Sequence, residues 1–84
     1  MSLRRYLVSM EPTIGRIVHY TEEGEGGDTV RPALIVELNG GHTVCLRVFG
    51  RETKGDMARS SVEHTEAPAG SPEARGKWSW PARV

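Results

Sequence analysis

The sequence predicts an all-β domain, a small five-stranded antiparallel barrel of the SH3-like kind that follows a short N-terminal arm. Ten glycines and five prolines divide the 84 residues into segments that are too short for long helices. Between them lie short runs of β-branched and aromatic residues, which favour strands. Most of these runs are about 8 to 12 residues apart, a spacing typical of small barrels. An OB-like barrel is the competing prediction.

Length and charge limit what the domain can do. We expect one domain over residues 12–84, with residues 1–11 as an arm. A chain of this size buries only about 60–65% of its unfolded surface, which disfavours a large internal active site. Eleven Lys and Arg residues balance eleven Asp and Glu residues, so any attraction to long nucleic acid or an anionic membrane must be local. No segment approaches the apolar length of a membrane span.

The first ten residues, MSLRRYLVSM, contain an apolar run that is too short and too broken for a signal peptide. We expect residues 1–9 to be an extension or an alternative start. They could instead form a helical turn in which Leu3, Tyr6 and Leu7 pack onto the barrel.

Two strands and a loop are predicted in the first half of the domain. Ile14–Tyr20 is β-branched and aromatic and follows Pro12, so it predicts the first strand. The next segment, TEEGEGGDT, has no apolar side chain and predicts a solvated, mobile loop. Pro32 then opens ALIVEL, which is typical of a core strand covered on both faces.

Asn39-Gly40-Gly41 is the strongest hairpin signal, because these residues tolerate positive φ. Alternation over Thr43–Phe49 places Val44, Leu46 and Val48 on one face, and Cys45, Arg47 and Phe49 on the other. Met57–Thr65 predicts a fourth strand. The stretch APAGSPEARG predicts a loop, and the final KWSWP predicts a short or edge strand because Pro81 cannot donate to a ladder.

No motif assembles a catalytic set, so we expect a protein that is not an enzyme and uses no cofactor or metal. Cys45 is expected to be a small buried residue in a reducing compartment, and His42 and His64 to be exposed residues. One cysteine and three histidines without close pairs indicate a zinc site only weakly. The acidic loop lacks the spacing of a calcium site, and GEGG lacks the Gly-Lys-Ser/Thr of a phosphate loop.

Arginine, histidine and aromatic side chains at strand positions are the candidates for ligand binding. They are Arg16, His19, Tyr20, Arg31, Arg47, Trp78 and Trp80. Arginine binds phosphate through two parallel hydrogen bonds, and aromatic rings stack on bases. The competing interpretation is structural: the tryptophans close the core, Tyr20 packs against them, and the arginines extend outward. We expect at least one tryptophan in the core and leave a stacking role open for the other.

Four pieces in order resemble a group of small phage and prophage proteins, usually without an assigned function. These pieces are PTIGRIVHY, RPALIV after an acidic Gly-rich insertion, a strand ending VF, and a final WSWP. The group opens near GRIVHY, carries an R-P-A step and closes on W-x-W-P. The resemblance covers residues 12–81; the arm at residues 1–9 departs from it, as does Ser79, where His is frequent. It implies action in the cytoplasm of an infected bacterium, or a place in the virion.

Three functional hypotheses follow. The first is a sponge that oligomerises and sequesters a small anionic nucleotide, such as a cyclic dinucleotide signal of host immunity, since balanced charge with local arginines suits a compact anion. The second is a virion decoration or assembly protein that binds neighbouring subunits through its arm and edge strand. The third, based on fold analogy alone, is a barrel that binds nucleic acid or inhibits a host protein. We also expect a homo-oligomer, because a small core with a short edge strand gains stability by self-association.

Overall fold

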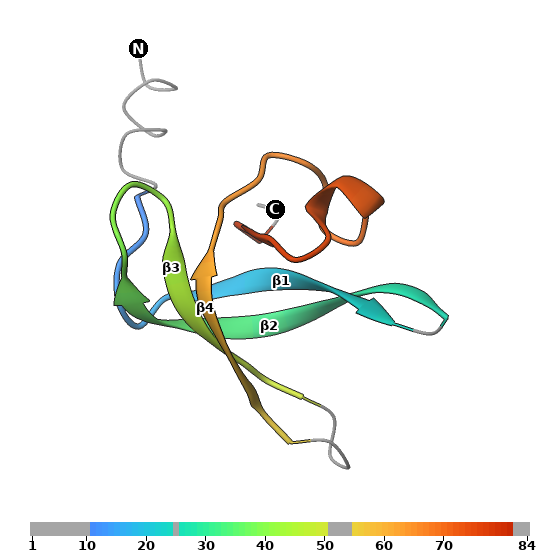
Figure 1. The fold of residues 1–84 in the computed structure, drawn as a ribbon, viewed down its shortest axis with the longest axis horizontal. Helices are drawn as coiled ribbons and strands as arrows, with labels where there is room; N and C mark the ends of the chain where they lie inside the picture. Colours follow the sequence, from blue (N-terminus) through green and yellow to red (C-terminus); the bar gives the residue numbers. More distant parts are fainter. Residues whose placement is uncertain (1–10, 25, 51–54, 82–84) are drawn as a thin grey trace.

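The computed structural model describes residues 11–24, 26–50 and 55–81, which form one five-stranded sheet and a short 3-10 helix (Figure 1). The strands are β1 (Ile17–Gly24), β2 (Gly27–Leu38), β3 (Val44–Val48), β4 (Met57–Val62) and β5 (Trp78–Ser79), and the helix η1 is Pro72–Ala74. All neighbouring strands in the sheet are antiparallel. The predicted small all-β domain with five antiparallel strands is therefore confirmed. The predicted arm, apart from Glu11, lies outside the described residues.

The strand order is β4-β3-β2-β1-β5, so β1 to β4 form a meander and β5 returns beside β1. This order fits an SH3-like domain and differs from the Greek key of the OB-like alternative. Ser61, near the end of β4, has a φ of 53°, and after Val62 the chain comes back to β5. There the Trp78 N–H donates to the Glu63 carbonyl (3.0 Å), and the Thr65 N–H donates to the Trp78 carbonyl (2.9 Å). This parallel bridge between His64 and Trp78 connects the chain that leaves β4 to β5, the strand at the opposite edge of the sheet.

The β1–β2 hairpin is longer than the sequence predicted. The first strand begins at Ile17 rather than Ile14, and it runs through the supposed loop to Gly24, where it pairs with Gly27. Two ion pairs explain why so acidic a segment stays paired: the Arg31 Nε donates to Glu22 Oε1 at 2.6 Å, and the Arg75 Nε donates to Asp28 Oδ1 at 2.7 Å. The expectation of a mobile loop is wrong, because partners distant in sequence neutralise its carboxylates.

The β2–β3 hairpin matches its prediction. The Asn39 N–H donates to the Thr43 carbonyl at 2.9 Å, and Gly40 and Gly41 have φ values of 106° and 58°. The predicted alternation in β3 is also observed, with Val44, Leu46 and Val48 buried and Arg47 exposed. Cys45 differs from expectation, because it lies on the outer face of β3, is half-buried, and donates its thiol to Asn39 Oδ1 at 3.2 Å.

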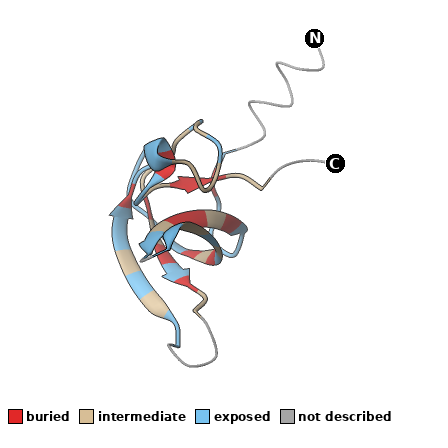
Figure 2. Cartoon of the chain, turned by 90° about the vertical axis from the view of Figure 1, so that its right-hand side faces the viewer, coloured by how far each residue is buried: buried red, intermediate tan, exposed pale blue. Residues whose placement is uncertain are grey.

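β2 is covered on one face only, which corrects the expected two-sided core strand. Ala33 and Ile35 are fully buried on the inner face, whereas Leu34 is half-buried and Glu37 is exposed on the outer face. Residues after β4 cover the outer face at Thr21 of β1, whereas Glu37 and Arg47 stay exposed on it, and Figure 2 shows buried and exposed positions alternating along the strands. Pro32 fits inside β2 because the β2–β3 pairing ends at Ala33, so its missing N–H falls beyond the ladder.

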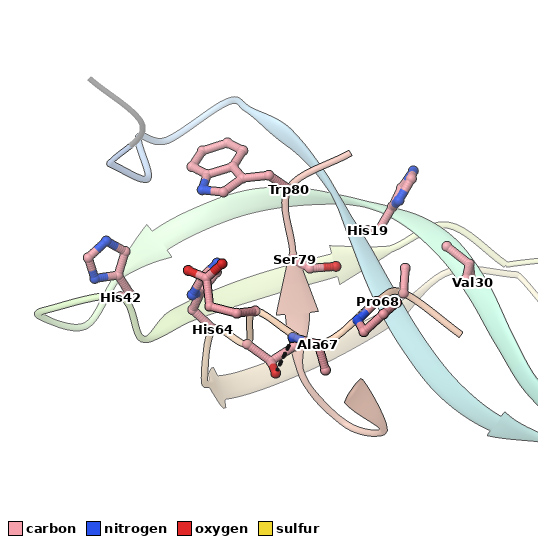
Figure 3. Close-up of a pocket in the computed structure, with 11 residues that line it drawn as sticks. His19, Val30, His42, His64, Ala67, Pro68, Ser79 and Trp80 are labelled. Atoms are coloured by element: carbon pink, nitrogen blue, oxygen red, sulfur yellow. Dashed lines mark hydrogen bonds between the residues drawn. The ribbon is translucent and has the colours of Figure 1, made fainter. Parts of the chain in front are cut away.

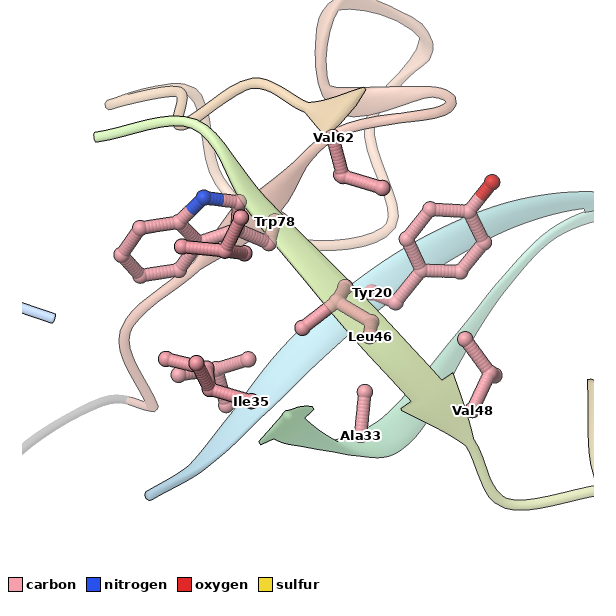
Figure 4. Close-up of a cluster of buried hydrophobic side chains, with 9 residues drawn as sticks. Tyr20, Ala33, Ile35, Leu46, Val48, Val62 and Trp78 are labelled. Atoms are coloured by element: carbon pink, nitrogen blue, oxygen red, sulfur yellow. The ribbon is translucent and has the colours of Figure 1, made fainter. Parts of the chain in front are cut away.

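The inner face of the sheet holds the core (Figure 4). Its buried members are Val18, Tyr20, Ala33, Ile35, Val44, Leu46, Val48, Val62 and Trp78. Trp78 is completely buried, and its indole N–H donates to the carbonyl of His42 at 2.8 Å. The prediction that at least one tryptophan belongs to the core is confirmed.

The segment after β4 packs along β1. The predicted fourth strand ends at Val62, and the following loop contains η1, with Ala74 buried. Thr21 is fully buried under this segment, where its carbonyl accepts from the Gly76 N–H at 2.8 Å and its Oγ1 accepts from the Gly70 N–H at 3.1 Å. Gly70 has a φ of 90°, and a Cβ there would lie 3.2 Å from Val30 Cγ2, so this close approach requires glycine. No helix among the described residues is long and apolar enough to span a membrane.

A matched pair of leucines on the inner side of the sheet tests how far the core extends. Leu46 is 1% exposed and Leu38 is 46% exposed. Leu46→Ala is expected to lower the free energy of unfolding by about 2–5 kcal/mol, because it leaves a cavity, whereas Leu38→Ala should cost less than about 1 kcal/mol. Urea unfolding followed by circular dichroism measures both values. Equal losses would mean that Leu38 is buried in solution.

Candidate ligand-binding groove

A groove of about 810 Å³ lies beside β5 and is called the groove below (Figure 3). It is lined by His19, Val30, His42, His64, Thr65, Glu66, Ala67, Pro68, Ala69, Ser79 and Trp80. All three histidines of the chain take part. The volume falls within the range of about 300–1,000 Å³ that is typical of small-molecule sites, and the wall is mostly apolar, as in such sites.

Four separate parts of the chain place the polar side chains of the groove. His19 of β1 pairs with Ser79 of β5, so their side chains leave the sheet on the same side. His42 belongs to the turn between β2 and β3, and His64 is the residue that bridges to Trp78. The groove therefore depends on the same bridge that joins the ends of the sheet.

One wall of the groove is formed by Trp80, His64 and His42, which belong to a continuous series of flat side chains. The Arg16 guanidinium carbon lies 5.1 Å from the centre of the Trp80 ring, a distance suited to a cation–π contact. The Trp80 ring meets the Trp78 ring edge to face, with centroids 5.2 Å apart. Trp78 meets His64 at 4.6 Å, and His64 lies 5.6 Å from His42. Because the buried Trp78 supports its neighbours on both sides, this wall is rigidly placed.

Several hydrogen-bond donors in the groove have no partner among the described residues. Ser79 is only 7% exposed, yet no described group bonds its hydroxyl. The same holds for the indole N–H of Trp80 and for the three imidazoles, whereas the indole of Trp78 is satisfied. A buried hydroxyl without a partner carries a desolvation cost of about 1–3 kcal/mol. A ligand that offers acceptors would remove this cost.

His64 has a perturbed titration. Burial against Trp78 lowers the pKa of His64 below its ordinary value; the Glu66 carboxylate opposes this shift, and His42 adds to it. His64 is half-buried, and its lowered pKa keeps the imidazole neutral at pH 7. The expectation that His64 is an ordinary exposed residue is therefore wrong. The expectation is right for His42, which is exposed in its turn. Packing on a tryptophan from another strand is not readable from the sequence around position 64.

The structure brings together some of the predicted ligand-binding residues and separates the others. His19 and Trp80 line the groove, Arg16 contacts Trp80, and Trp78 lies behind the wall. The other three lie elsewhere: Tyr20 packs in the core, Arg31 pairs with Glu22, and Arg47 points outward from β3. The predicted set of three phosphate-binding arginines therefore reduces to Arg16 at this site.

Sequence reasoning missed several residues of the groove. Ser79 and Pro68 carry no local motif, and only the β1–β5 register and the return of the chain after Val62 bring them to His19. The described residues contain no cluster of His, Cys, Asp or Glu suited to a metal ion. No hydrogen bond joins the Ser79 hydroxyl to the His19 imidazole in this part of the chain. The arrangement is suited to holding a ligand.

Comparison with known proteins gave no match to a family model, a curated protein or a solved structure. The groove must therefore be interpreted from its own chemistry.

The lowered pKa of His64 predicts a loss of stability in mild acid. The native pKa of His64 lies below the unfolded value of about 6.5. Above that pH the shift therefore costs no stability, and as the pH falls through it the free energy of unfolding decreases. The thermal midpoint should fall between pH 7.5 and pH 5.5, and His64→Gln should reduce that fall. His19→Gln serves as the control and should retain it. Identical profiles for the parent protein and His64→Gln would contradict the assignment.

Proposed function

We propose that this chain is a non-enzymatic binding protein that holds a small anionic ligand of the nucleotide type in the groove. The observation that carries the proposal is the group of donors that have no partner among the described residues, led by the buried Ser79 hydroxyl, beside the Trp80 ring. Donors without acceptors favour a ligand rich in acceptor oxygens, and an apolar aromatic wall favours a flat ring. A nucleotide combines both features.

The contacts of the groove suggest a placement for such a ligand. A phosphate would lie near Arg16, which does not line the groove itself but contacts the lining residue Trp80. The base would lie against Trp80 and the apolar side chains of Ala67 and Pro68. Glu66 is the one carboxylate among the lining residues, so it would oppose a phosphate placed beside it and favour the exocyclic amine of a base.

The resemblance to small phage proteins suggests the biological role. In an infected bacterium, a binding protein without catalytic groups would act by sequestration, and a cyclic nucleotide signal of host immunity is the ligand class we propose for it. The alternative, a virion or assembly protein, is favoured by a different observation: the outer face of the sheet exposes Ile17.

A thermal-shift screen against cyclic di- and trinucleotides, with linear nucleotides for comparison, tests the ligand class. A ligand bound only by the native state stabilises it by about 2.7 kcal/mol at a hundred times its Kd, which raises the melting temperature. Arg16→Ala should raise the Kd by about tenfold or more, because a charged hydrogen bond is lost. Arg47→Ala is the matched control, since Arg47 lies outside the groove, and it should leave the Kd unchanged.

Ser79→Ala removes the unpartnered hydroxyl and adds a second test of position. It should weaken ligand binding while leaving the unliganded protein as stable as the parent, or more stable, since the desolvation cost disappears. Equal effects of Arg16→Ala and Arg47→Ala on the Kd would place the ligand elsewhere. If no nucleotide in the panel shifts the melting temperature, the nucleotide proposal fails.

A further inference from the structure

We infer that the outer face of the sheet is a self-association surface, on which a second copy of this chain packs face to face. The inference does not rest on the groove proposal, although the two surfaces adjoin at β1, where His19 follows Ile17 on the same side of the strand. It is defined by Ile17 of β1, Leu34 and Glu37 of β2, Cys45 and Arg47 of β3, and Ala58 of β4, and is called the outer face below.

Strand register places these side chains together. Ile17 pairs with Leu34, Leu34 with Arg47, and Arg47 with Ala58, which forms one row across four strands. Directly opposite residues in antiparallel strands point to the same side, so the whole row faces away from the core. Glu37 pairs with Cys45 in the neighbouring row, on the same side as Arg47.

The outer face is apolar at its centre. Ile17 is 46% exposed, Leu34 is half-buried, and Cys45 lies beside them, so these three residues form an apolar group next to Arg47. An apolar patch that crosses several strands and is bordered by charges is typical of a protein contact.

Two charged side chains of the outer face, Arg47 and Glu37, indicate a second copy as the partner. Arg47 and Glu37 lie diagonally across β2 and β3, and neither forms an ion pair within the described ranges. Consider a two-fold axis that lies in the interface, midway between Arg47 and Glu37 and perpendicular to the line that joins them. This axis would place each Arg47 over the Glu37 of the other copy. An isologous dimer requires such reciprocal contacts, and one arginine with one glutamate provides them. Leu34 and Cys45 would then lie near the axis and be buried on both copies.

Reversal of each charge tests the pairing in the full-length chain. In Arg47→Glu, two carboxylates would face two carboxylates across the interface; in Glu37→Arg, arginines would face arginines. Each variant alone should therefore dissociate, with a dimer Kd about tenfold or more above that of the parent. An equimolar mixture of the two variants should recover a heterodimer, because all its cross-interface pairs are then opposite in charge. Native mass spectrometry distinguishes the heterodimer by mass.

Controls separate this inference from the other possibilities. Glu73→Arg, on the exposed helix η1, changes net charge as Glu37→Arg does and should leave the dimer intact. Circular dichroism confirms that each variant is folded. A monomeric parent chain at concentrations of about 100 μM, a dimer that survives both reversals, or a mixture without heterodimer would overturn the inference. If the parent is monomeric and deletion of residues 1–10 exposes new apolar surface, the arm covers the face instead. Nucleotide binding to Ser79 and Trp80 can succeed or fail independently of these outcomes.

Discussion

Trp78 connects three separate parts of this domain through its backbone and its buried indole. Its backbone pairs with Tyr20 of β1 on one side and with Glu63 and Thr65 on the other, and its N–H holds the carbonyl of His42 in the β2–β3 turn. A two-residue strand could not hold its place through backbone hydrogen bonds alone. Burial of the large ring supplies the missing free energy, since fully buried aromatic side chains dominate the energetics of small cores. Trp78 therefore stabilises β5, the β2–β3 turn and the groove together.

The same interaction explains how a domain of this size forms a binding groove at all. A small barrel has no room for an internal cavity, so its sites must lie where loops meet an edge of the sheet. Here the chain after Val62 returns to β5 instead of continuing the ladder of β4, and residues 64–69 form the rim of the groove. Thr21 and Gly70 fix the far end of this rim through one hydrogen bond of 3.1 Å. The groove is thus built from backbone pairing between segments that are distant in sequence.

That distance also decides how much the sequence could predict. The β2–β3 hairpin and the alternation of β3 are local properties, and Asn39-Gly40-Gly41 with Val44, Leu46 and Val48 predicted them correctly. The acidic hairpin was missed because its stability depends on Arg31 and Arg75, and Arg75 is 47 residues from Asp28. The candidate site was predicted only in part for the same reason. Residue type identified His19 and Trp80, whereas Ser79 and His64 acquire their roles from the β1–β5 register and from contact with Trp78.

The two tryptophans show how one short motif can serve the core and a site at once. Trp78 is fully buried with its N–H satisfied, while Trp80, two positions later, is half-buried with its N–H unpartnered among the described residues. Between them Ser79 is turned toward His19, as alternation in an extended segment requires. Removal of Trp78 would therefore disturb Trp80, Ser79 and His64 together, so loss of binding in such a variant could not be assigned to any one contact. Substitutions at Arg16 and Ser79 avoid this difficulty, because neither side chain belongs to the apolar core.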